Sequence, residues 1–174
     1  VEMYMQRLGE DGCAALLAAS NAPCPADLQV NTLKADTAAV QQALAAQGVD
    51  TCVHPWLPDC LCAVDFGNLT ELSAFQNGQI YVQDAAARLA IRAAALRPGM
   101  RVIDGCAAPG GKSFSAAVDM RNTGHILSCD LHGKKLGQIA SGAQRLGITI
   151  IETRAADGRV PASELVNTAD AVLA

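Results

Sequence analysis

Apolar and polar positions along residues 79–174 predict strands and helices in alternation. Short apolar runs, mostly Val and Ile, are typical of strands, and amphipathic stretches that end at Gly or Pro are typical of helices. Strands are expected at 100–103, 125–129 and 148–153, with a fourth opening at 170–173, and helices at 85–96, 112–120 and 134–146. Asp84 is the expected N-cap of the first helix and Gly147 the C-cap of the last. This order predicts an α/β fold, a parallel sheet with crossover helices.

The first 78 residues show a different pattern, in which strands and helices are short and irregularly spaced. We predict helices at 1–19 and 37–47, a strand at 28–33, two short strands between 50 and 64 and a helical turn at 68–75. Asp36 or Thr37 is the expected N-cap of the second helix, and Gly48 its end. A small α+β module, residues 1–78, is therefore expected to precede the α/β domain, residues 79–174.

The loop after the strand at 100–103 is rich in small residues. A strand, a tight turn and a helix hold nucleotide-like cofactors, because the backbone comes close to the ligand and the helix N-terminus offers free N–H groups. Residues 106–113 match a P-loop except that Cys106 replaces its first glycine, and no Gly-x-Gly-x-x-Gly dinucleotide fingerprint is present. The third interpretation, a loop for S-adenosylmethionine, needs close backbone approach and a later carboxylate.

Two acidic residues supply such carboxylates. Asp130 stands at the end of the strand at 125–129, 19 residues after Gly111, close to the offset of about 20 residues expected of a ribose-binding acid. Asp157 follows the next strand. Ligands bind at the carboxyl ends of parallel strands, so we expect residues 105–112, Asp130 and Asp157 to converge. A helix N-cap for Asp130 and an Asp-Gly turn for Asp157 are the structural alternatives.

The loop also carries a resemblance. The stretch Asp104-x-Cys106-Ala107-Ala108-Pro109-Gly110-Gly111-Lys112 resembles the cofactor motif of the RNA cytosine-C5 methyltransferases, and residues 81–87, Tyr-Val-Gln-Asp-Ala-Ala-Ala, resemble the bacterial branch (Sun/Fmu type) that methylates 16S ribosomal RNA. The resemblance extends over residues 20–174. It implies a Rossmann-like methyltransferase sheet, S-adenosylmethionine as cofactor, 16S rRNA as partner, a monomer, and transfer of a methyl group to carbon 5 of a cytosine.

The resemblance also implies roles for single residues. Gly110 and Gly111 let the backbone approach the amino-acid end of the cofactor, Asp130 accepts hydrogen bonds from the ribose hydroxyls, and Asp157 lies near the adenine amino group. Lys112 pairs with the cofactor carboxylate or with another loop. Cys106 lines the pocket of the methyl donor and is not the nucleophile. The full set expected to bind the cofactor is Cys106, Ala107, Ala108, Pro109, Gly110, Gly111, Lys112, Asp130 and Asp157.

The catalytic cysteines of the family lie elsewhere. One attacks carbon 6 of the cytosine and another assists release, from an Asp-x-Pro-Cys motif after strand four and a Thr-Cys motif after strand five. Neither motif stands at its place in this chain, which reaches Ala174 at strand four. We expect the front part of a methyltransferase domain, inactive alone, with the nucleophile beyond residue 174. The alternatives are a non-catalytic module that binds S-adenosylmethionine or RNA, and a P-loop NTPase.

Charge is divided unevenly between the two parts. Residues 1–78 hold two basic and nine acidic residues, a balance of −7, and residues 79–174 hold eleven basic and eight acidic, a balance of +3. A surface that binds RNA is usually basic, so the first part is a poor candidate. The family usually has arginine where this chain has Gln29, which places an RNA contact at this position in doubt. A packing role for the first part is at least as well supported.

Cysteine content and hydropathy indicate the cellular compartment and bear on metal and membrane binding. Seven scattered cysteines do not suggest a secreted disulfide framework, and a reducing cytoplasm fits better. Cys52-x-His54 and Cys60-x-Cys62 lack the usual spacing of zinc ligands, so we expect no metal site. No apolar run reaches the roughly 18 residues that a membrane span needs, and no secretory signal is visible.

Overall fold

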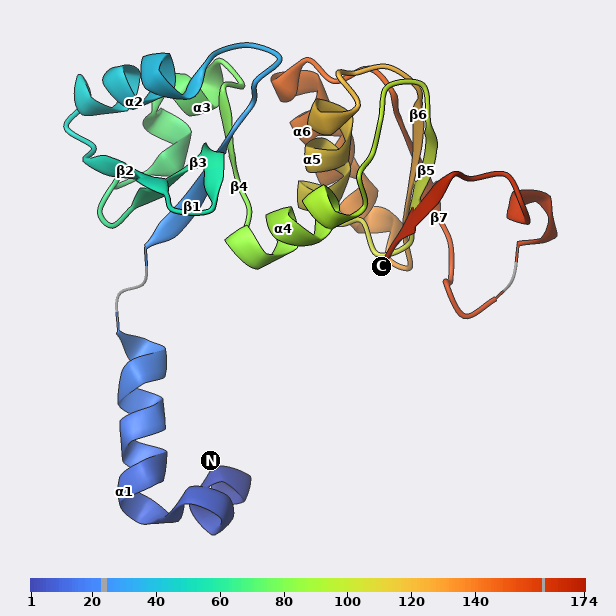
Figure 1. The fold of residues 1–174 in the computed structure, drawn as a ribbon. Helices are drawn as coiled ribbons and strands as arrows, with labels where there is room; N and C mark the ends of the chain where they lie inside the picture. The colour runs from blue at the N-terminus through green and yellow to red at the C-terminus, as the bar shows by residue number, and fades with distance from the viewer. Residues whose placement is uncertain (23–24, 161) are drawn as a thin grey trace.

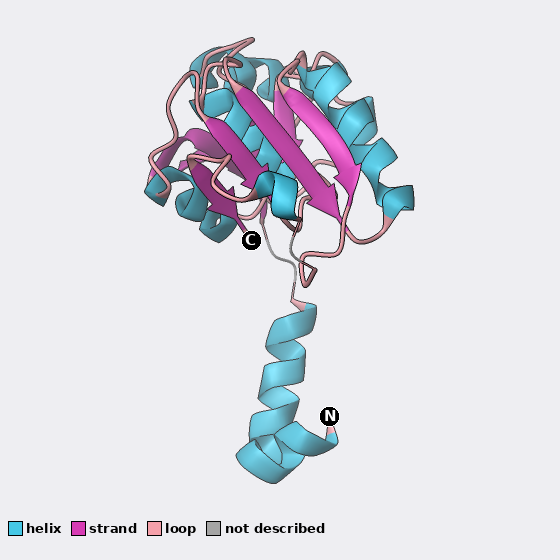
Figure 2. Cartoon of the chain, turned by 90° about the vertical axis from the view of Figure 1, so that its right-hand side faces the viewer, coloured by secondary structure: helices cyan, strands magenta, loops and turns pink. Residues whose placement is uncertain are grey.

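The computed structural model describes residues 1–22, 25–160 and 162–174, and within them the strands form two four-stranded sheets (Figure 1). The first helix, α1 (Glu2–Asn21), lies apart from both sheets and is interrupted at Gly9, whose φ of 71° and ψ of 179° are not helical. Figure 2 shows the same separation from the side. The buried apolar core is therefore formed by the two sheets and the helices that cover them.

The first sheet is antiparallel and has the order β2-β3-β1-β4. Its strands are β1 (Ala26–Val30), β2 (Thr51–His54), β3 (Leu57–Ala63) and β4 (Ile80–Val82). Helices α2 (Thr37–Ala45) and α3 (Ser73–Gln76), with the 3₁₀ turn η1 (Leu69–Glu71), pack on one face over a buried apolar cluster that includes Leu28, Leu44 and Leu61. The other face carries polar and thiol side chains. An α+β module is thus present, as the hydrophobic pattern predicted.

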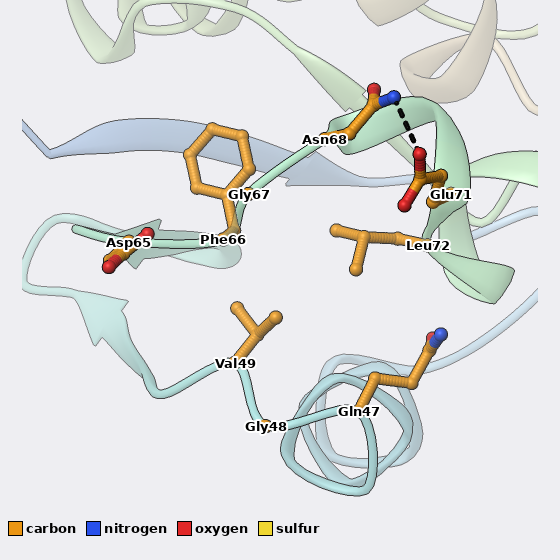
Figure 3. Close-up of a pocket in the computed structure, with 9 residues that line it drawn as sticks. All are labelled: Gln47, Gly48, Val49, Asp65, Phe66, Gly67, Asn68, Glu71 and Leu72. Atoms are coloured by element: carbon orange, nitrogen blue, oxygen red, sulfur yellow. Dashed lines mark hydrogen bonds between the residues drawn. The ribbon is translucent and has the colours of Figure 1, made fainter.

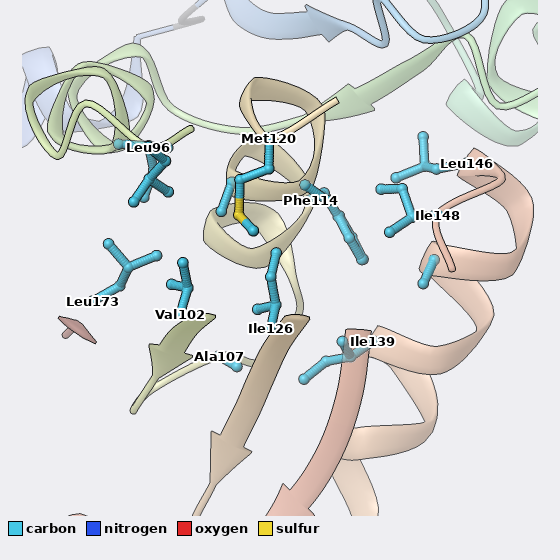
Figure 4. Packing of buried hydrophobic residues seen from close by; sticks show 14 of the residues in the cluster. Leu96, Val102, Ala107, Phe114, Met120, Ile126, Ile139, Leu146, Ile148 and Leu173 are labelled. Atoms are coloured by element: carbon cyan, nitrogen blue, oxygen red, sulfur yellow. The ribbon is translucent and has the colours of Figure 1, made fainter. Parts of the chain in front are cut away.

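The second sheet is parallel throughout and has the order β7-β6-β5-β8. Its strands are β5 (Arg101–Asp104), β6 (His125–Asp130), β7 (Ile151–Ala155) and β8 (Ala171–Leu173), and its helices are α4 (Ala85–Ala93), α5 (Gly111–Asp119) and α6 (Leu136–Leu146), with the 3₁₀ turns η2 (Gly133–Lys135) and η3 (Ser163–Leu165). The apolar cluster between sheet and helices includes Val102, Phe114, Met120, Ile126 and Ile139 (Figure 4). The predicted parallel α/β sheet is confirmed.

Several predicted boundaries were wrong for identifiable reasons. The first strand ends at Val30 instead of residue 33, because Asn31 starts a turn in which its side chain accepts the N–H of Leu33 at 3.2 Å. The strand β7 begins at Ile151 instead of residue 148, because the N–H of Ile148 donates to the carbonyl of Ala143 at 2.9 Å and closes helix α6. Strand β4 was not predicted, and it pairs with β1 although it lies beyond residue 78.

The predicted caps are present. The N–H of Ala39 donates to Asp36 at 2.8 Å, and that of Ala86 to Asp84 at 2.7 Å, so both carboxylates satisfy a free N–H at the start of a helix. Gly147 ends α6 with a φ of 74°, a left-handed conformation that costs a residue without Cβ little.

Buried polar contacts connect the two sheets. Asn31 donates its amide to the carbonyls of Gly78 (2.9 Å) and Leu146 (2.8 Å), and Arg145 on α6 donates to the carbonyl of Ile80 at 2.9 Å and lies 3.7 Å from the ring centroid of Phe75. These groups are far apart in sequence. Their partners are backbone oxygens that would otherwise be left without a hydrogen bond, so the contact fixes how the first sheet sits against α6.

Candidate functional site

A cavity of about 470 Å³ lies at the carboxyl ends of the parallel strands. It lies where β5, β6, β7 and β8 end, and its volume is in the range of a small-molecule site. Of the residues predicted to bind a cofactor, it brings together Cys106, Asp130 and Asp157. The complete lining is Gly105, Cys106, Asp130, Leu131, Ala156, Asp157, Gly158, Arg159, Val172, Leu173 and Ala174.

The loop from β5 to α5 is held from beneath by Asp104. This carboxylate is fully buried and accepts the Ser113 hydroxyl at 2.8 Å and the N–H of Cys106 at 3.3 Å. The Ser113 hydroxyl also lies 2.7 Å from that of Ser128 on β6. The amine of Lys112 donates to the carbonyl of Cys106 at 2.7 Å and lies 3.5 Å from Asp104. The polar side chains of the motif therefore stabilise the loop itself.

This arrangement argues against the P-loop interpretation. In a P-loop the lysine reaches the phosphates and the next hydroxyl binds Mg²⁺. Here Lys112 is turned back to its own loop, and Ser113 is fully buried between Asp104 and Ser128. Neither group faces the cavity, so a nucleotide phosphate would lack both of its usual partners.

Asp130 ends β6 at the rim of the cavity. Its Oδ1 accepts the N–H of His132 at 2.9 Å and its Oδ2 accepts the N–H of Ala108 at 3.2 Å. The hydrogen bond from His132, together with that from Ala108, lowers the pKa of Asp130 below its usual value. The carboxylate is thus ionised and fixed in direction, and each oxygen keeps a lone pair for a hydroxyl donor.

Asp157, which follows β7, lines the same cavity and is paired with its neighbour Arg159. The guanidinium donates to Oδ1 at 2.9 Å and to Oδ2 at 2.8 Å, and this hydrogen bonding lowers the pKa of Asp157. The arginine side chain is 84% exposed, so the pair is held weakly. An Asp-Gly turn was the structural alternative for this residue, and the N–H of Arg159 does donate to Asp157 at 3.0 Å.

Gly110 and Gly111 of the loop are not part of this cavity lining. Gly110 has a φ of 121°, and a Cβ added there would lie 2.3 Å from the ring of Phe114. Its lack of a side chain is therefore explained by packing. Pro109 and Gly111 line a second cavity of about 430 Å³ on the other side of the loop, beside Phe114 and Tyr81. Ala107 is buried, and Ala108 contributes its N–H to Asp130.

Some lining residues were not identified from the sequence. Leu131 is 55% exposed beside Asp130, and Val172 is 69% exposed in the middle of β8. Exposed apolar side chains beside a carboxylate suit a ligand with a flat apolar part and hydroxyl groups. Their signal in the sequence was position alone, since Leu131 follows one predicted parallel strand and Val172 lies within another.

A third cavity, of about 490 Å³, lies in the first part of the chain (Figure 3). It is open between the end of α2 and the turn η1, and its charged groups are Asp65 and Glu71. The amide of Asn68 donates to Glu71 at 2.9 Å, so this carboxylate already has a local partner. None of the predicted cofactor residues lines it, and its acidic character does not suit an anionic ligand.

Membrane association through a spanning helix finds no support in the described ranges. Within residues 1–22, 25–160 and 162–174, no helix combines the length and the apolar character that crossing a bilayer requires.

Both parts of the chain match known protein families. Residues 1–69 match the family described as Methyltr_RsmF/B-like, ferredoxin-like domain, and residues 92–174 match the family described as 16S rRNA methyltransferase RsmB/F. The probable ribosomal RNA small subunit methyltransferase B of Bacillus subtilis is 38% identical over 132 residues, which cover 76% of this chain and 29% of that protein. The protein of the same description from Synechocystis is 34% identical over 97% of this chain and 39% of its own length.

A solved structure agrees with these relatives. The crystal structure of a methyltransferase homolog protein from Pyrococcus horikoshii superposes with a TM-score of 0.73 at 30% identity, over 87% of this chain and 50% of that one. The predicted Rossmann-like methyltransferase sheet, preceded by a small α+β module, is thus confirmed. The chain spans less than two fifths of the length of the two curated relatives.

Proposed function

Because the chain belongs to the RsmB/F family of 16S rRNA methyltransferases, we propose that it carries the cofactor half of such an enzyme's active site. One observation carries the proposal: Cys106, Asp130 and Asp157 come from three separate loops and line one cavity at the carboxyl edge of the parallel sheet. In this fold that edge is where ligands bind. The ligand we assign to it is S-adenosylmethionine.

The hydrogen-bond acceptors and the apolar side chains at the cavity fit this cofactor. S-adenosylmethionine has two ribose hydroxyls, which need acceptors, and no phosphates, which would need cations. Asp130 is ionised and held by two backbone N–H groups, so it offers acceptors at a fixed position. Leu131 beside it and Val172 across the cavity offer apolar surface for the adenine ring. Asp157 accepts the adenine amino group once Arg159 turns toward solvent.

For the whole enzyme we propose a methyl transfer from S-adenosylmethionine to carbon 5 of a cytosine in 16S rRNA. Carbon 5 becomes nucleophilic only after a thiolate adds to carbon 6. Cys106 is exposed but lies in the cofactor loop, where its backbone holds Asp104 and Lys112. Its place supports a lining role and not the role of nucleophile. We assign the nucleophile to the Asp-x-Pro-Cys motif of the family.

We propose that the two parts of the chain have different roles, as their charges suggest. Residues 1–78 form a packing module and residues 79–174 the cofactor domain, with β4 completing the sheet of the module. Gln29 is 1% exposed and donates to the carbonyl of Gln83 at 3.0 Å, so it supports packing and not RNA contact. The six cysteines among the described residues are free thiols, which supports a reducing cytoplasm. We further propose that the protein acts as a monomer.

Calorimetric titration with S-adenosylhomocysteine tests the cofactor site. The chain is expected to bind this compound, and Asp130→Ala is expected to weaken binding at least about tenfold, because two ribose hydroxyls lose their acceptor. Asp65→Ala removes an exposed carboxylate outside the cavity and serves as the matched control. ATP with Mg²⁺ is the second ligand. Binding of ATP in place of S-adenosylhomocysteine would overturn the proposal in favour of a P-loop.

The alternative function is a module that binds cofactor or RNA without catalysis. Methyl transfer to a 16S rRNA fragment by the full-length protein, lost on replacing the cysteine of its Asp-x-Pro-Cys motif, supports the enzyme. Cofactor binding without methyl transfer by that protein supports the module.

A further inference from the structure

Three strands of the first sheet place potential metal ligands in one row. Cys62 on β3 is directly opposite Cys52 on β2 and directly opposite Asp27 on β1. Directly opposed residues of antiparallel strands lie on the same face of a sheet with their Cβ atoms about 5 Å apart. His54 follows Cys52 by two residues, and its ring lies near Asp27 and Cys62 although the pairing of β2 with β3 shifts register at this point. The row lies far in sequence from the cofactor loop.

The ligand atoms in this row lie slightly farther apart than they would around a bound metal ion. The ligand atoms of Asp27, His54 and Cys62 all lie within 4.8 Å of one another. Bonds of about 2.0–2.3 Å in a tetrahedral zinc site put ligand atoms roughly 3.3–3.8 Å apart, so adjustments of about 1 Å in side chains would close the group. All three side chains are partly exposed and Cys52 is exposed, so an ion reaches them from solvent.

The hydrogen bonds of the row prepare it for a cation. Oδ2 of Asp27 accepts the N–H of Ala85 at 2.8 Å, which orients the carboxylate, and Oδ1 accepts the thiol of Cys62 at 3.5 Å. A divalent cation at this place would lie between the Cys62 sulfur and the Asp27 carboxylate, which already face each other.

We propose that Asp27, Cys52, His54 and Cys62 form a binding site for a thiophilic divalent cation, with zinc as the best match. Two thiolates, an imidazole and a carboxylate are all ligands that zinc accepts in four-coordinate sites. The sequence pattern suggested a different and poorer set, which included Cys60. In the structure Cys60 is fully buried and its sulfur accepts the amide of Gln29 at 3.2 Å, so Asp27 replaces it in the row.

A cation at this place joins β1, β2 and β3. β2 is the edge strand of the sheet, has four residues, and pairs irregularly with β3 at Val53 and His54. An ion that binds the folded state but not the unfolded chain stabilises the fold by mass action. The site is thus a structural one, which holds the edge strand in register.

Cobalt and zinc titrations of the chain under reducing conditions test the site. Co²⁺ is expected to give thiolate-to-metal charge-transfer absorption and the intense visible bands of tetrahedral coordination, and Zn²⁺ to displace it. Trp56, the only tryptophan, has its ring centroid 5.8 Å from that of His54, so Co²⁺ should also quench the fluorescence of the chain. Competition with a chromophoric chelator gives the zinc affinity.

Two variants and two matched controls separate this site from adventitious binding. His54→Ala and Cys62→Ser are expected to weaken zinc at least about tenfold and to abolish the charge-transfer band or reduce it. His132→Ala and Cys106→Ser remove an exposed imidazole and an exposed thiol elsewhere and should change neither. Asp27→Asn keeps the volume of the side chain and is the third variant if Cys62→Ser does not fold.

Three results would overturn the proposal. These are a cobalt spectrum without thiolate charge transfer, a zinc affinity that His54→Ala and Asp27→Asn leave unchanged, or a Cys52–Cys62 disulfide that persists in reductant. None of them bears on the cofactor site, because that site is tested by S-adenosylhomocysteine.

Discussion

Arg88 on α4 donates to both carboxylate oxygens of Asp119 on α5, at 2.8 Å and 2.7 Å, while its side chain is only 1% exposed. The same guanidinium donates to Asp59 on β3 at 2.7 Å. One buried cation therefore joins the first sheet to two helices of the second. Its charge is compensated from both sides, which is the condition under which a buried ion is tolerated.

Replacing this arginine should destabilise the whole chain. Arg88→Ala is expected to lower the free energy of unfolding by about 3–5 kcal/mol, because Asp119 would be left partly buried without its counter-ion. Urea denaturation followed by circular dichroism measures the change. Arg97→Ala, an exposed arginine after α4, should stay within about 0.5 kcal/mol of the parent chain. Equal losses in the two variants would contradict this account.

The same ion pairs predict how stability depends on pH. Burial raises the pKa of Asp59, but the hydrogen bond and charge of Arg88, together with Arg92, outweigh it, so the pKa lies below its usual value. A carboxyl group with a lowered pKa in the folded state stabilises the fold above the unfolded pKa, and this contribution is lost as pH falls through the folded pKa. Stability should therefore fall below about pH 4.

Unfolding curves at several pH values for the parent chain and Asp59→Asn check this prediction. The variant is expected to be less stable at neutral pH and to lose less on acidification. Two curves that fall in parallel with pH would show that Asp59 does not carry the effect.

Gly110 should tolerate no side chain. At a φ of 121°, with the Phe114 ring 2.3 Å from an added Cβ, Gly110→Ala is expected to cost about 1–3 kcal/mol and to weaken S-adenosylhomocysteine by displacing the loop. Gly137→Ala lies in α6 with no atom near the added Cβ and should gain up to about 1 kcal/mol. Thermal unfolding and calorimetry measure both. A neutral Gly110→Ala would mean that Phe114 moves aside.

Cys106 should report occupation of the cavity. Its side chain is exposed and lines the cavity, whereas Cys52 is exposed on the first sheet. Saturating S-adenosylhomocysteine is expected to slow alkylation of Cys106 several-fold and to leave Cys52 unchanged. Mass spectrometry of the digested chain at timed intervals measures both rates. Protection of neither thiol, with binding shown by calorimetry, would place the ligand elsewhere.

Arg159 should compete with the cofactor for Asp157. Its ion pair is exposed and screened by solvent, so Arg159→Ala should bind S-adenosylhomocysteine as tightly as the parent chain or up to a few-fold more tightly. Asp157→Ala should bind it more weakly, because the adenine amino group loses an acceptor. Calorimetry separates the two. Weaker binding by Arg159→Ala would mean that the guanidinium itself contacts the ligand.

Much of the second sheet could be predicted from the local pattern of apolar and polar residues. The alternation of apolar runs with helices, the caps at Asp84 and Gly147 and the position of Asp130 at the end of its strand depend on neighbours in sequence, so they were predictable. Strand β4 was missed because its three residues make a strand only when β1 is beside them. Residue 148 was predicted as the start of β7 because Ile148 is apolar. In the structure its N–H donates to the carbonyl of Ala143, so it belongs to the end of α6.

The sequence by itself determined the α/β order, the α+β module, the small-residue loop and the family, because each is written in residues close along the chain. Only the tertiary structure decided what the polar groups contact. It placed Ser113 beneath Asp104, buried Gln29, and set Asp27, Cys62 and His54 in one row across three strands. Those contacts depend on strand register and on how the sheets pack. Registers join residues tens of positions apart, which no periodicity records.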